Sequence, residues 1–201
     1  MITTSDPKLA KKASKLRDCG RKSQYVHDVI GYTSRLNSVN AAVGRVQLRR
    51  LDEWNEKRRH AAEIYHRLLS DIDSLTLPPA GDADGVQPVF HLYVIRTTLR
   101  DDLKAWLESN GISCGIHYVL PIHLQPIYNK MFGFKEGLYP KAEELCKTCL
   151  SIPMYPDLQS SEISFISDRI HYFFEKKGKM QNGRADKYWS SRRRLLGTKG
   201  N

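Results

Sequence analysis

The sequence predicts an α/β fold in which helices pack on a small sheet. First, candidate strands and helices alternate from residue 89 to residue 173, a pattern typical of layered α/β structures. Second, apolar side chains recur with a period near 3.6 over residues 37–70, which predicts one helix of about 50 Å. Third, 40% of the residues are hydrophobic, enough for a core, while no apolar run is long enough to span a bilayer.

Residues 1–36 predict a helix followed by an irregular polar segment. Asp6 is a candidate N-cap and Pro7 suits the first helical position. An apolar stripe follows, and Gly20 is expected to end the helix. The segment closes with Gly31-Tyr32-Thr33-Ser34-Arg35, a short polar loop ahead of the next helix. Such a loop is well placed to bind an anion, because free N–H groups and the helix dipole both favour negative charge.

The long helix is expected to link two bodies, since it exceeds the length of one face of a small domain. Asn37 or Ser38 can cap its first turn, and no proline interrupts it. The residues expected on its apolar face are Val39, Val43, Val46, Trp54, Ala61, Tyr65 and Leu68. We therefore assign residues 1–36 to a first body, 37–72 to the linking helix, 73–176 to a small α/β domain and 177–201 to a disordered basic tail.

Within residues 73–176, three strands alternate with three helices. Strands are expected at 89–97, 112–119 and 151–154. Helices are expected at 100–110, from Pro140 with Ala142, Leu145 and Cys149 on one face, and from Ser160 or Ser161 onward. Two prolines break residues 120–128, which are expected to form a loop or a short helical turn.

The distribution of charge and the spacing of the cysteines limit the classes of function that the chain can have. The formal net charge is +10, of which residues 175–201 hold +7 and residues 1–174 hold +3. A basic tail can bind nucleic acid or an acidic surface, or it can be a solvated terminus. We favour the solvated terminus because tails are commonly disordered. Cys146 and Cys149 have CxxC spacing without a second ligand pair, so we expect core residues and no metal site. The N-terminus lacks a secretory pattern, which predicts a cytoplasmic protein.

Two clusters could carry chemistry: the 31–35 loop with Asn37, and residues 115–125. The histidines of the second cluster, His117 and His123, are six residues apart with a proline between them, so they do not form a helical metal pair. No nucleophile elbow, P-loop, zinc-protease motif or paired-carboxylate catalytic pattern is present. The residues alone indicate an α/β protein with a candidate anion-binding loop.

Eight segments together resemble the C-terminal part of the DegT/DnrJ/EryC1/StrS sugar aminotransferases. The segments occur in the family's order: LRDCG (16–20), GYTSRLN (31–37), AAVGRVQLRRLD (41–52), RRHAAEIYHRLL (58–69), HLYVIR (91–96), LESNGISCGIHYVLPIHLQPIY (107–128), YPKAEELCKTCLSIPMYPDL (139–158) and the closing helix. The resemblance implies the small domain of a fold-type I, pyridoxal-phosphate aminotransferase, with a long linking helix and a remnant of the large domain.

The resemblance also implies an activity and its parts. Family members transfer an amino group, usually from glutamate, to a keto group on a nucleotide-linked sugar, as homodimers with the active site at the subunit interface. The family's cofactor lysine lies upstream of the segment that matches residues 2–4. The chain is therefore expected to begin after that lysine, to hold no catalytic residue of its own and to be inactive alone, because the cofactor has no covalent anchor.

Site residues follow from the matched motifs. Thr33 and Arg35 lie in the family's GYNxR loop, which reaches the cofactor phosphate of the neighbouring subunit, although Thr33 replaces the usual asparagine. His117, Tyr118 and His123 match a segment near the active-site cleft, which implies a substrate-side role. The alternative is that these three residues only brace the small domain.

Two other functions compete with a truncated aminotransferase. The chain could be a non-catalytic subunit or binding module that pairs with a separate large-domain polypeptide. It could also be a basic-tailed nucleic-acid binder, which we disfavour because residues 1–174 hold little of the net charge.

Overall fold

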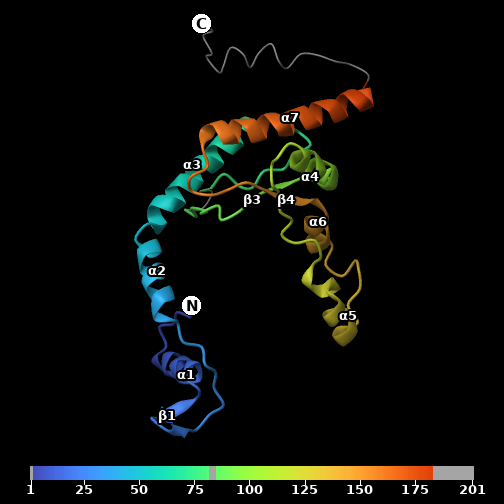
Figure 1. Ribbon diagram of the computed structural model, residues 1–201. Helices are drawn as coiled ribbons and strands as arrows, with labels where there is room; N and C mark the ends of the chain where they lie inside the picture. The colour runs from blue at the N-terminus through green and yellow to red at the C-terminus, as the bar shows by residue number, and fades with distance from the viewer. Residues whose placement is uncertain (1, 82–84, 183–201) are drawn as a thin grey trace. The chain divides into compact units, whose positions relative to one another are not determined.

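The computed structural model describes residues 2–81 and 85–182 of the chain, in two compact units (Figure 1). The N-terminal unit ends at Asp52 and the C-terminal unit begins at Glu53. Helices dominate both units, and each unit contains one two-stranded antiparallel sheet. The predicted α/β class is therefore confirmed.

The N-terminal unit consists of two helices and a hairpin. Its elements are α1 (Pro7–Arg17), β1 (Arg21–Ser23), β2 (Val26–His27) and α2 (Ser38–Leu48). Helix α1 begins as predicted, because the Asp6 side chain accepts hydrogen bonds from the backbone N–H groups of Lys8 and Leu9. Among residues 2–52, only Gly20 is buried. This unit therefore has no hydrophobic core of its own.

The C-terminal unit holds the core. Its elements are α3 (Leu51–Leu69, which starts just before the unit boundary), β3 (Tyr93–Arg96), α4 (Arg100–Ser109), η1 (Ile122–Leu124), α5 (Pro126–Phe132), α6 (Pro140–Thr148), β4 (Cys149–Ile152) and α7 (Ser160–Asn182). Strands β3 and β4 pair antiparallel, with Tyr93 opposite Ile152 and Arg96 opposite Cys149. Single bridges, Thr76 to Arg96 and Gly115 to Ser151, extend the sheet on both sides.

Helices α3, α4 and α7 supply most of the apolar side chains packed around this sheet (Figure 1). The residues that are completely buried include Tyr65, Leu69, Tyr93, Ile95, Leu103, Leu107, Leu150 and Ile170. Helix α4 also docks on α7 through its tryptophan. The Trp106 ring stacks on Tyr172 with ring centroids 5.4 Å apart, and its indole N–H donates to the Arg169 carbonyl at 3.0 Å.

The predicted single helix over residues 37–72 is wrong, because the structure has two helices. Residues 49 and 50 form a turn, in which the Arg50 N–H donates to the Gln47 carbonyl. Arg45 and Arg49 are like charges four residues apart, which disfavours a continuous helix at this point. No side chain of α2 is buried, whereas α3 buries five, so packing supports only the second helix.

Other boundaries also differ from the expectations. The strand expected at 89–97 is shorter, since Phe90 has a positive φ of 46° and pairing begins at Tyr93. The strand expected at 112–119 is reduced to the single bridge at Gly115. Helix α5 replaces part of the loop expected at 120–128, after the short helical turn η1. Helix α7 continues through residues 177–182, which the sequence places in the disordered tail, while residues 183–201 lie outside the described residues.

Candidate functional site

The loop at residues 31–35 is clamped to the end of α1. The Tyr32 N–H donates to the Leu16 carbonyl at 2.7 Å, and the Tyr32 carbonyl accepts from the Cys19 N–H at 3.0 Å. The Ser34 N–H donates to the Arg17 carbonyl at 3.0 Å. These backbone bonds fix the loop although its side chains are mostly exposed.

Two glycines make this clamp possible. Gly20 has a φ of +71°, and a Cβ atom there would lie 1.8 Å from the Val29 carbonyl oxygen. A Cβ atom at Gly31 would lie 1.9 Å from the Gly20 nitrogen. Because these neighbours are backbone atoms, neither position accepts a side chain without displacing the loop.

Within the loop, both predicted phosphate contacts already have partners. One amino nitrogen of the Arg35 guanidinium, Nη2, pairs with Asp18 Oδ1 at 2.5 Å, and the Thr33 hydroxyl lies 3.3 Å from the Cys19 sulfur. The Arg35 side chain is still 56% exposed. A guanidinium has five N–H groups, so those not facing Asp18 stay available to a phosphate.

The charge of the N-terminal unit also suits an anion. Residues 1–52 contain 11 Lys and Arg against four Asp and Glu, a net charge of +7. Residues 53–174 contain 12 against 16, a net charge of −4, so the +3 of residues 1–174 conceals two opposite charges. Asn37 caps α2 by accepting from the Val39 N–H at 2.8 Å, which confirms the first of the two predicted caps. The residues of this unit therefore fit the phosphate end of a cofactor.

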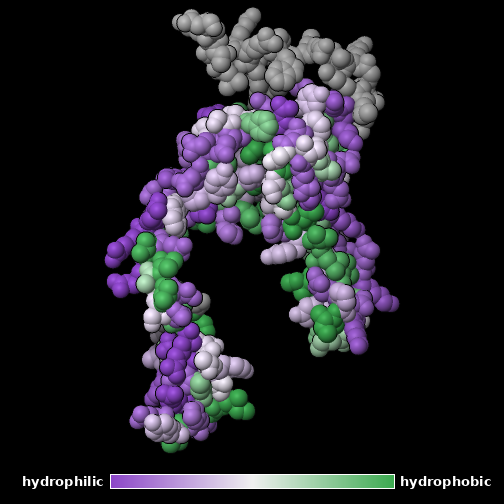
Figure 2. Space-filling model, viewed as in Figure 1, coloured by the Kyte–Doolittle hydropathy of each residue, from purple (hydrophilic) through white to green (hydrophobic). Residues whose placement is uncertain are grey.

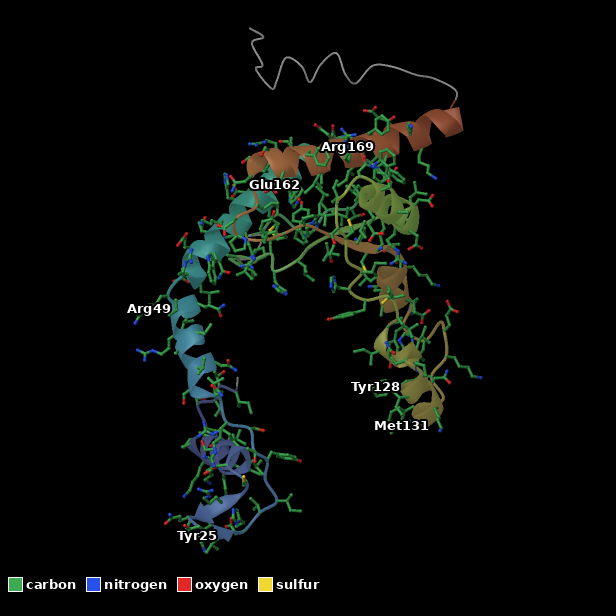
Figure 3. The ribbon with its side chains drawn as sticks, in the orientation of Figure 1. Tyr25, Arg49, Tyr128, Met131, Glu162 and Arg169 are labelled. Atoms are coloured by element: carbon green, nitrogen blue, oxygen red, sulfur yellow. The ribbon has the colours of Figure 1, made fainter. Side chains whose placement is uncertain are left out.

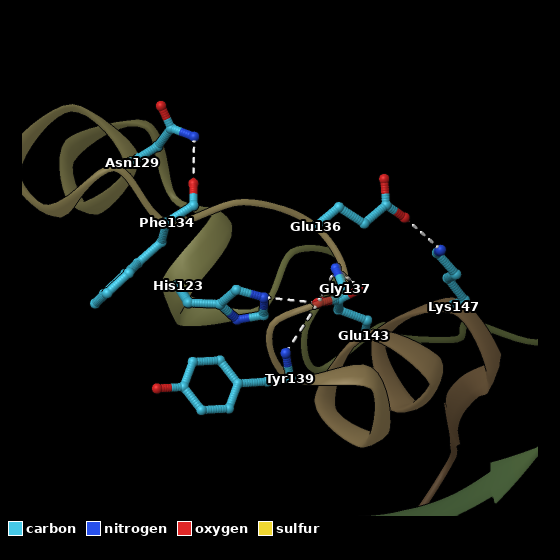
Figure 4. Close-up of polar contacts among 8 residues, drawn as sticks. All are labelled: His123, Asn129, Phe134, Glu136, Gly137, Tyr139, Glu143 and Lys147. Carbon is cyan, nitrogen blue, oxygen red and sulfur yellow. Dashed lines mark hydrogen bonds and ion pairs between the residues drawn. The ribbon is translucent and has the colours of Figure 1, made fainter.

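The second predicted cluster lies entirely in the C-terminal unit. His117 Nδ1 and the Ser151 hydroxyl on β4 are 2.9 Å apart. His123 is buried in η1, where its Nε2 lies 2.9 Å from Glu143 Oε1 on α6 (Figure 4). Tyr118 is 73% exposed. The structure therefore gives each histidine its own protein partner, buries only His123 of the three, and leaves His117 and Tyr118 exposed.

The sequence reasoning missed Asp18, Ser151 and Glu143, the side chains that hold these predicted residues. Nothing in the local pattern marks Asp18 or Ser151. Glu143 had a signal, because a carboxylate in the first turn of a helix commonly accepts from free backbone N–H groups.

The two lysines with a shifted pKa, Lys57 and Lys147, are not activated amines. The pKa of Lys57 is raised by hydrogen bonds to Glu53 and Asp157, and that of Lys147 is raised by Glu136. Both shifts are opposite to the lowered pKa that an amine nucleophile needs. The described residues also contain no group of three metal-ligating side chains and no helix long and apolar enough to cross a membrane.

The thiols are not activated either. Burial raises the pKa of the Cys114 thiol to about 11, and burial together with Cys149 raises the pKa of Cys146. A thiol with a raised pKa is a poor nucleophile at neutral pH. All four cysteines are free. Cys149 is buried as predicted, but it begins strand β4 and does not lie on the helix, while Cys146 lies on α6 and is partly exposed.

Comparison with known proteins identifies the family. The model of the DegT/DnrJ/EryC1/StrS aminotransferase family matches residues 1–171. The chain belongs to this family. A pleiotropic regulatory protein of Geobacillus stearothermophilus is 41% identical over 175 residues, which are 87% of this chain and 46% of that protein. A dTDP-3-amino-3,4,6-trideoxy-alpha-D-glucose transaminase of Streptomyces venezuelae is 36% identical over 87% of this chain and 45% of that protein.

Solved structures of the family have the same fold. The crystal structure of S. venezuelae DesV in complex with a ketimine intermediate matches 92% of this chain and 47% of its own, with a TM-score of 0.82 and 34% identity. A DegT/DnrJ/EryC1/StrS aminotransferase from Brucella abortus matches 85% of this chain and 45% of its own, with a TM-score of 0.76 and 32% identity. The chain spans about half the length of the curated relatives and structures that it matches.

Proposed function

We propose that this chain forms the C-terminal half of a pyridoxal-phosphate aminotransferase for nucleotide-linked keto sugars, with a glutamate-type amino donor. The observation that carries the proposal is the likeness to the S. venezuelae ketimine complex over 92% of the chain. Relatives named as transaminases of dTDP-linked and UDP-linked sugars support the same substrate class. The product would enter amino-sugar biosynthesis for a polysaccharide or a secondary metabolite.

In this proposal the N-terminal unit contributes to the cofactor site. Arg35 and Thr33 would contact the phosphate of pyridoxal phosphate held in a neighbouring subunit. The cofactor supplies the electron sink that makes amino transfer possible. Asp18 holds one edge of Arg35 and leaves the remaining N–H groups to the phosphate, while the clamped backbone keeps the loop from collapsing.

The C-terminal unit would contribute to the substrate side. Tyr118 offers an exposed ring and hydroxyl to the nucleotide sugar, and His117 and His123 hold the segment that carries it. Because carboxylates raise the pKa of both Lys57 and Lys147, neither is an activated amine, and we propose that these residues alone do not catalyse amino transfer.

A partner polypeptide is needed to cover the N-terminal unit. Helix α2 exposes Val39, Val43 and Val46 on one face, and Figure 2 shows hydrophobic residues on the surface over this helix. A helix of 11 residues without buried side chains is not stable alone in water. We propose that this face packs in a homodimer or against a separate chain that carries the large, cofactor-binding domain.

The exposed apolar face of α2 also favours the alternative function, a non-catalytic subunit that only binds and stabilises such a large-domain chain. The two functions differ in whether the loop residues affect cofactor binding. Arg35→Ala should weaken pyridoxal phosphate binding if the loop contacts the phosphate, and should leave it unchanged in a purely structural subunit.

The test is complementation. The full chain is co-expressed with the N-terminal half of the S. venezuelae transaminase, the half that has no counterpart here, and assayed with pyridoxal phosphate, glutamate and a dTDP-linked keto sugar. Formation of 2-oxoglutarate should require both polypeptides. Arg35→Ala should raise the Kd for the cofactor about tenfold or more, which corresponds to one lost charge-assisted contact.

Arg49→Ala is the matched control, because Arg49 is another exposed arginine of the N-terminal unit, at the end of α2 (Figure 3). Turnover by the chain alone would contradict the proposed need for a partner. A stable complex whose cofactor affinity is the same with and without Arg35 would favour the non-catalytic subunit.

A further inference from the structure

The segment from His117 to His123, which we call the presenting segment, is fixed at both ends and exposed between them. Its first residue is held on β4 by Ser151, and Gly115 packs so closely that a Cβ atom there would lie 2.6 Å from the His117 ring. Its last residue is held on α6 by Glu143. Between these anchors, the side chains of Tyr118, Val119 and Ile122 are exposed.

Glu143, which holds the last residue of the presenting segment, is a buried carboxylate. Glu143 is only 6% exposed, yet its carboxylate has four hydrogen-bond contacts (Figure 4). The Gly137 N–H lies 2.9 Å from both carboxylate oxygens, the Tyr139 N–H donates to Oε1 at 3.3 Å, and His123 Nε2 lies 2.9 Å from Oε1. A buried carboxylate is costly unless it is fully satisfied, so this arrangement is specific to a charged group at this position.

These contacts join three separate parts of the chain. Glu143 belongs to α6, Gly137 and Tyr139 to the loop before it, and His123 to η1. The His123 ring also packs edge-on against the Tyr139 ring, with centroids 4.9 Å apart. The carboxylate therefore connects the presenting segment to a helix that is itself anchored in the core, since the buried Arg100 donates to the Cys146 carbonyl at 3.0 Å.

We propose that Glu143 is a positioning residue that, through His123, holds the presenting segment on α6 so that Tyr118 faces the nucleotide sugar. The proposal rests on the proposed function for the substrate-side role of Tyr118. The competing explanation is that Glu143 only fixes the loop at residues 133–139. The two differ in whether the presenting segment loosens when the link through His123 is removed.

Amide hydrogen exchange of the full chain, without any ligand, tests the positioning directly. In Glu143→Gln, peptides covering both 117–125 and 133–139 should exchange about tenfold faster, because a buried charged acceptor is lost. Glu136→Gln is the matched control. Glu136 lies in the same loop, but its pair with Lys147 is on the surface, so exchange should not change.

Two variants of His123 distinguish the loss of its contact with Glu143 from a change in packing. In His123→Gln the amide nitrogen can occupy the place of Nε2, so protection of residues 117–125 should be kept. In His123→Asn the amide reaches only to the position of Nδ1, so residues 117–125 should lose protection while residues 133–139 keep it. Peptides from α4 and α7 report whether each variant is folded. Unchanged exchange at 117–125 in both Glu143→Gln and His123→Asn would overturn the proposal.

The complemented enzyme tests the consequence for substrate. Glu143→Gln should raise KM for the nucleotide sugar several-fold with a smaller change in kcat, and His123→Gln should retain the wild-type KM. An unchanged KM despite faster exchange at 117–125 would overturn the substrate role of Tyr118, while the exchange pattern itself does not depend on the proposed activity.

Discussion

Tyr65 links helix α3 to the chain after β4 by one buried hydrogen bond. Its side chain is completely buried, and its hydroxyl donates to the Pro153 carbonyl at 3.0 Å. Tyr65→Phe leaves that carbonyl without its donor and should lower the free energy of unfolding by about 1–2 kcal/mol, measured by urea denaturation. Tyr155→Phe is the control, since the Tyr155 hydroxyl bonds Glu162 at the surface and its loss should change stability by less than about 0.5 kcal/mol.

Glu143 also gives the stability of the C-terminal unit a pH dependence. The N–H of Gly137, with His123 and Tyr139, lowers the pKa of Glu143 below its usual value of 4.5. Because the folded-state pKa is the lower one, the ionised carboxylate stabilises the fold above about pH 4.5. This contribution is lost as the pH falls through the folded-state pKa.

The difference in urea midpoint between wild type and Glu143→Gln should therefore be constant near pH 7 and shrink below pH 4.5. Glu136→Gln controls for general acid effects at the surface. A difference that stays constant down to pH 3 would contradict an ionised, hydrogen-bonded Glu143.

At the scale of elements, helical periodicity predicted α4 and α7 well but misplaced the buried face of α6. Leu103 and Leu107 of α4 are buried as predicted. On α6, Leu145 was expected inward and is exposed, while Glu143 is buried. Periodicity assigns the apolar face to the interior, and it cannot anticipate a carboxylate whose partners come from distant residues such as His123.

The strands were harder to predict than the helices, because their pairing also depends on partners that are distant in the sequence. Residues 112–119 have the composition of a strand, yet only Gly115 pairs, because the chain then turns so that His117 reaches Ser151. The break between α2 and α3 depends on which helix has a packing partner, which a local pattern does not contain. Of the candidate site, the sequence predicted the loop and the presenting segment through their resemblance to the family, but not the side chains that hold them.

A leucine-to-alanine substitution is expected to lower the free energy of unfolding by different amounts on α4 and on α6, because one leucine is buried and the other is exposed. Leu107→Ala removes a completely buried side chain and should lower the free energy of unfolding by about 2–5 kcal/mol. Leu145→Ala should change it by less than about 0.5 kcal/mol, because Leu145 is exposed and alanine favours a helix. Urea denaturation followed by circular dichroism measures both. Equal costs would contradict the described orientation of α6.

On the scale of the whole molecule, the two units differ in how much they bury. Among the described residues 2–52 of the N-terminal unit only Gly20 is buried, whereas the C-terminal unit has a continuous apolar core. Exposed apolar side chains also lie on α5, where Tyr128 and Met131 extend from the helix (Figure 3). The C-terminal unit is therefore expected to fold on its own core, and the N-terminal unit is expected to need a partner.

Native-state hydrogen exchange should report this difference in the isolated chain. Amides of α1 and α2 should exchange at least tenfold faster than those of β3, β4 and α4, since few buried contacts oppose local opening. Adding the complementing large-domain polypeptide should slow exchange in α2 specifically. Equal protection of both units in the isolated chain would contradict a coreless N-terminal unit.

The stacking of Trp106 on Tyr172 has a practical consequence. The indole sits where α4 meets α7, with its N–H bound to a main-chain oxygen of α7. In a chain carrying Trp54→Phe and Trp189→Phe, Trp106 would be the single remaining tryptophan, and its fluorescence would report the docking of these helices without any label. A red shift of its emission would then mark their separation.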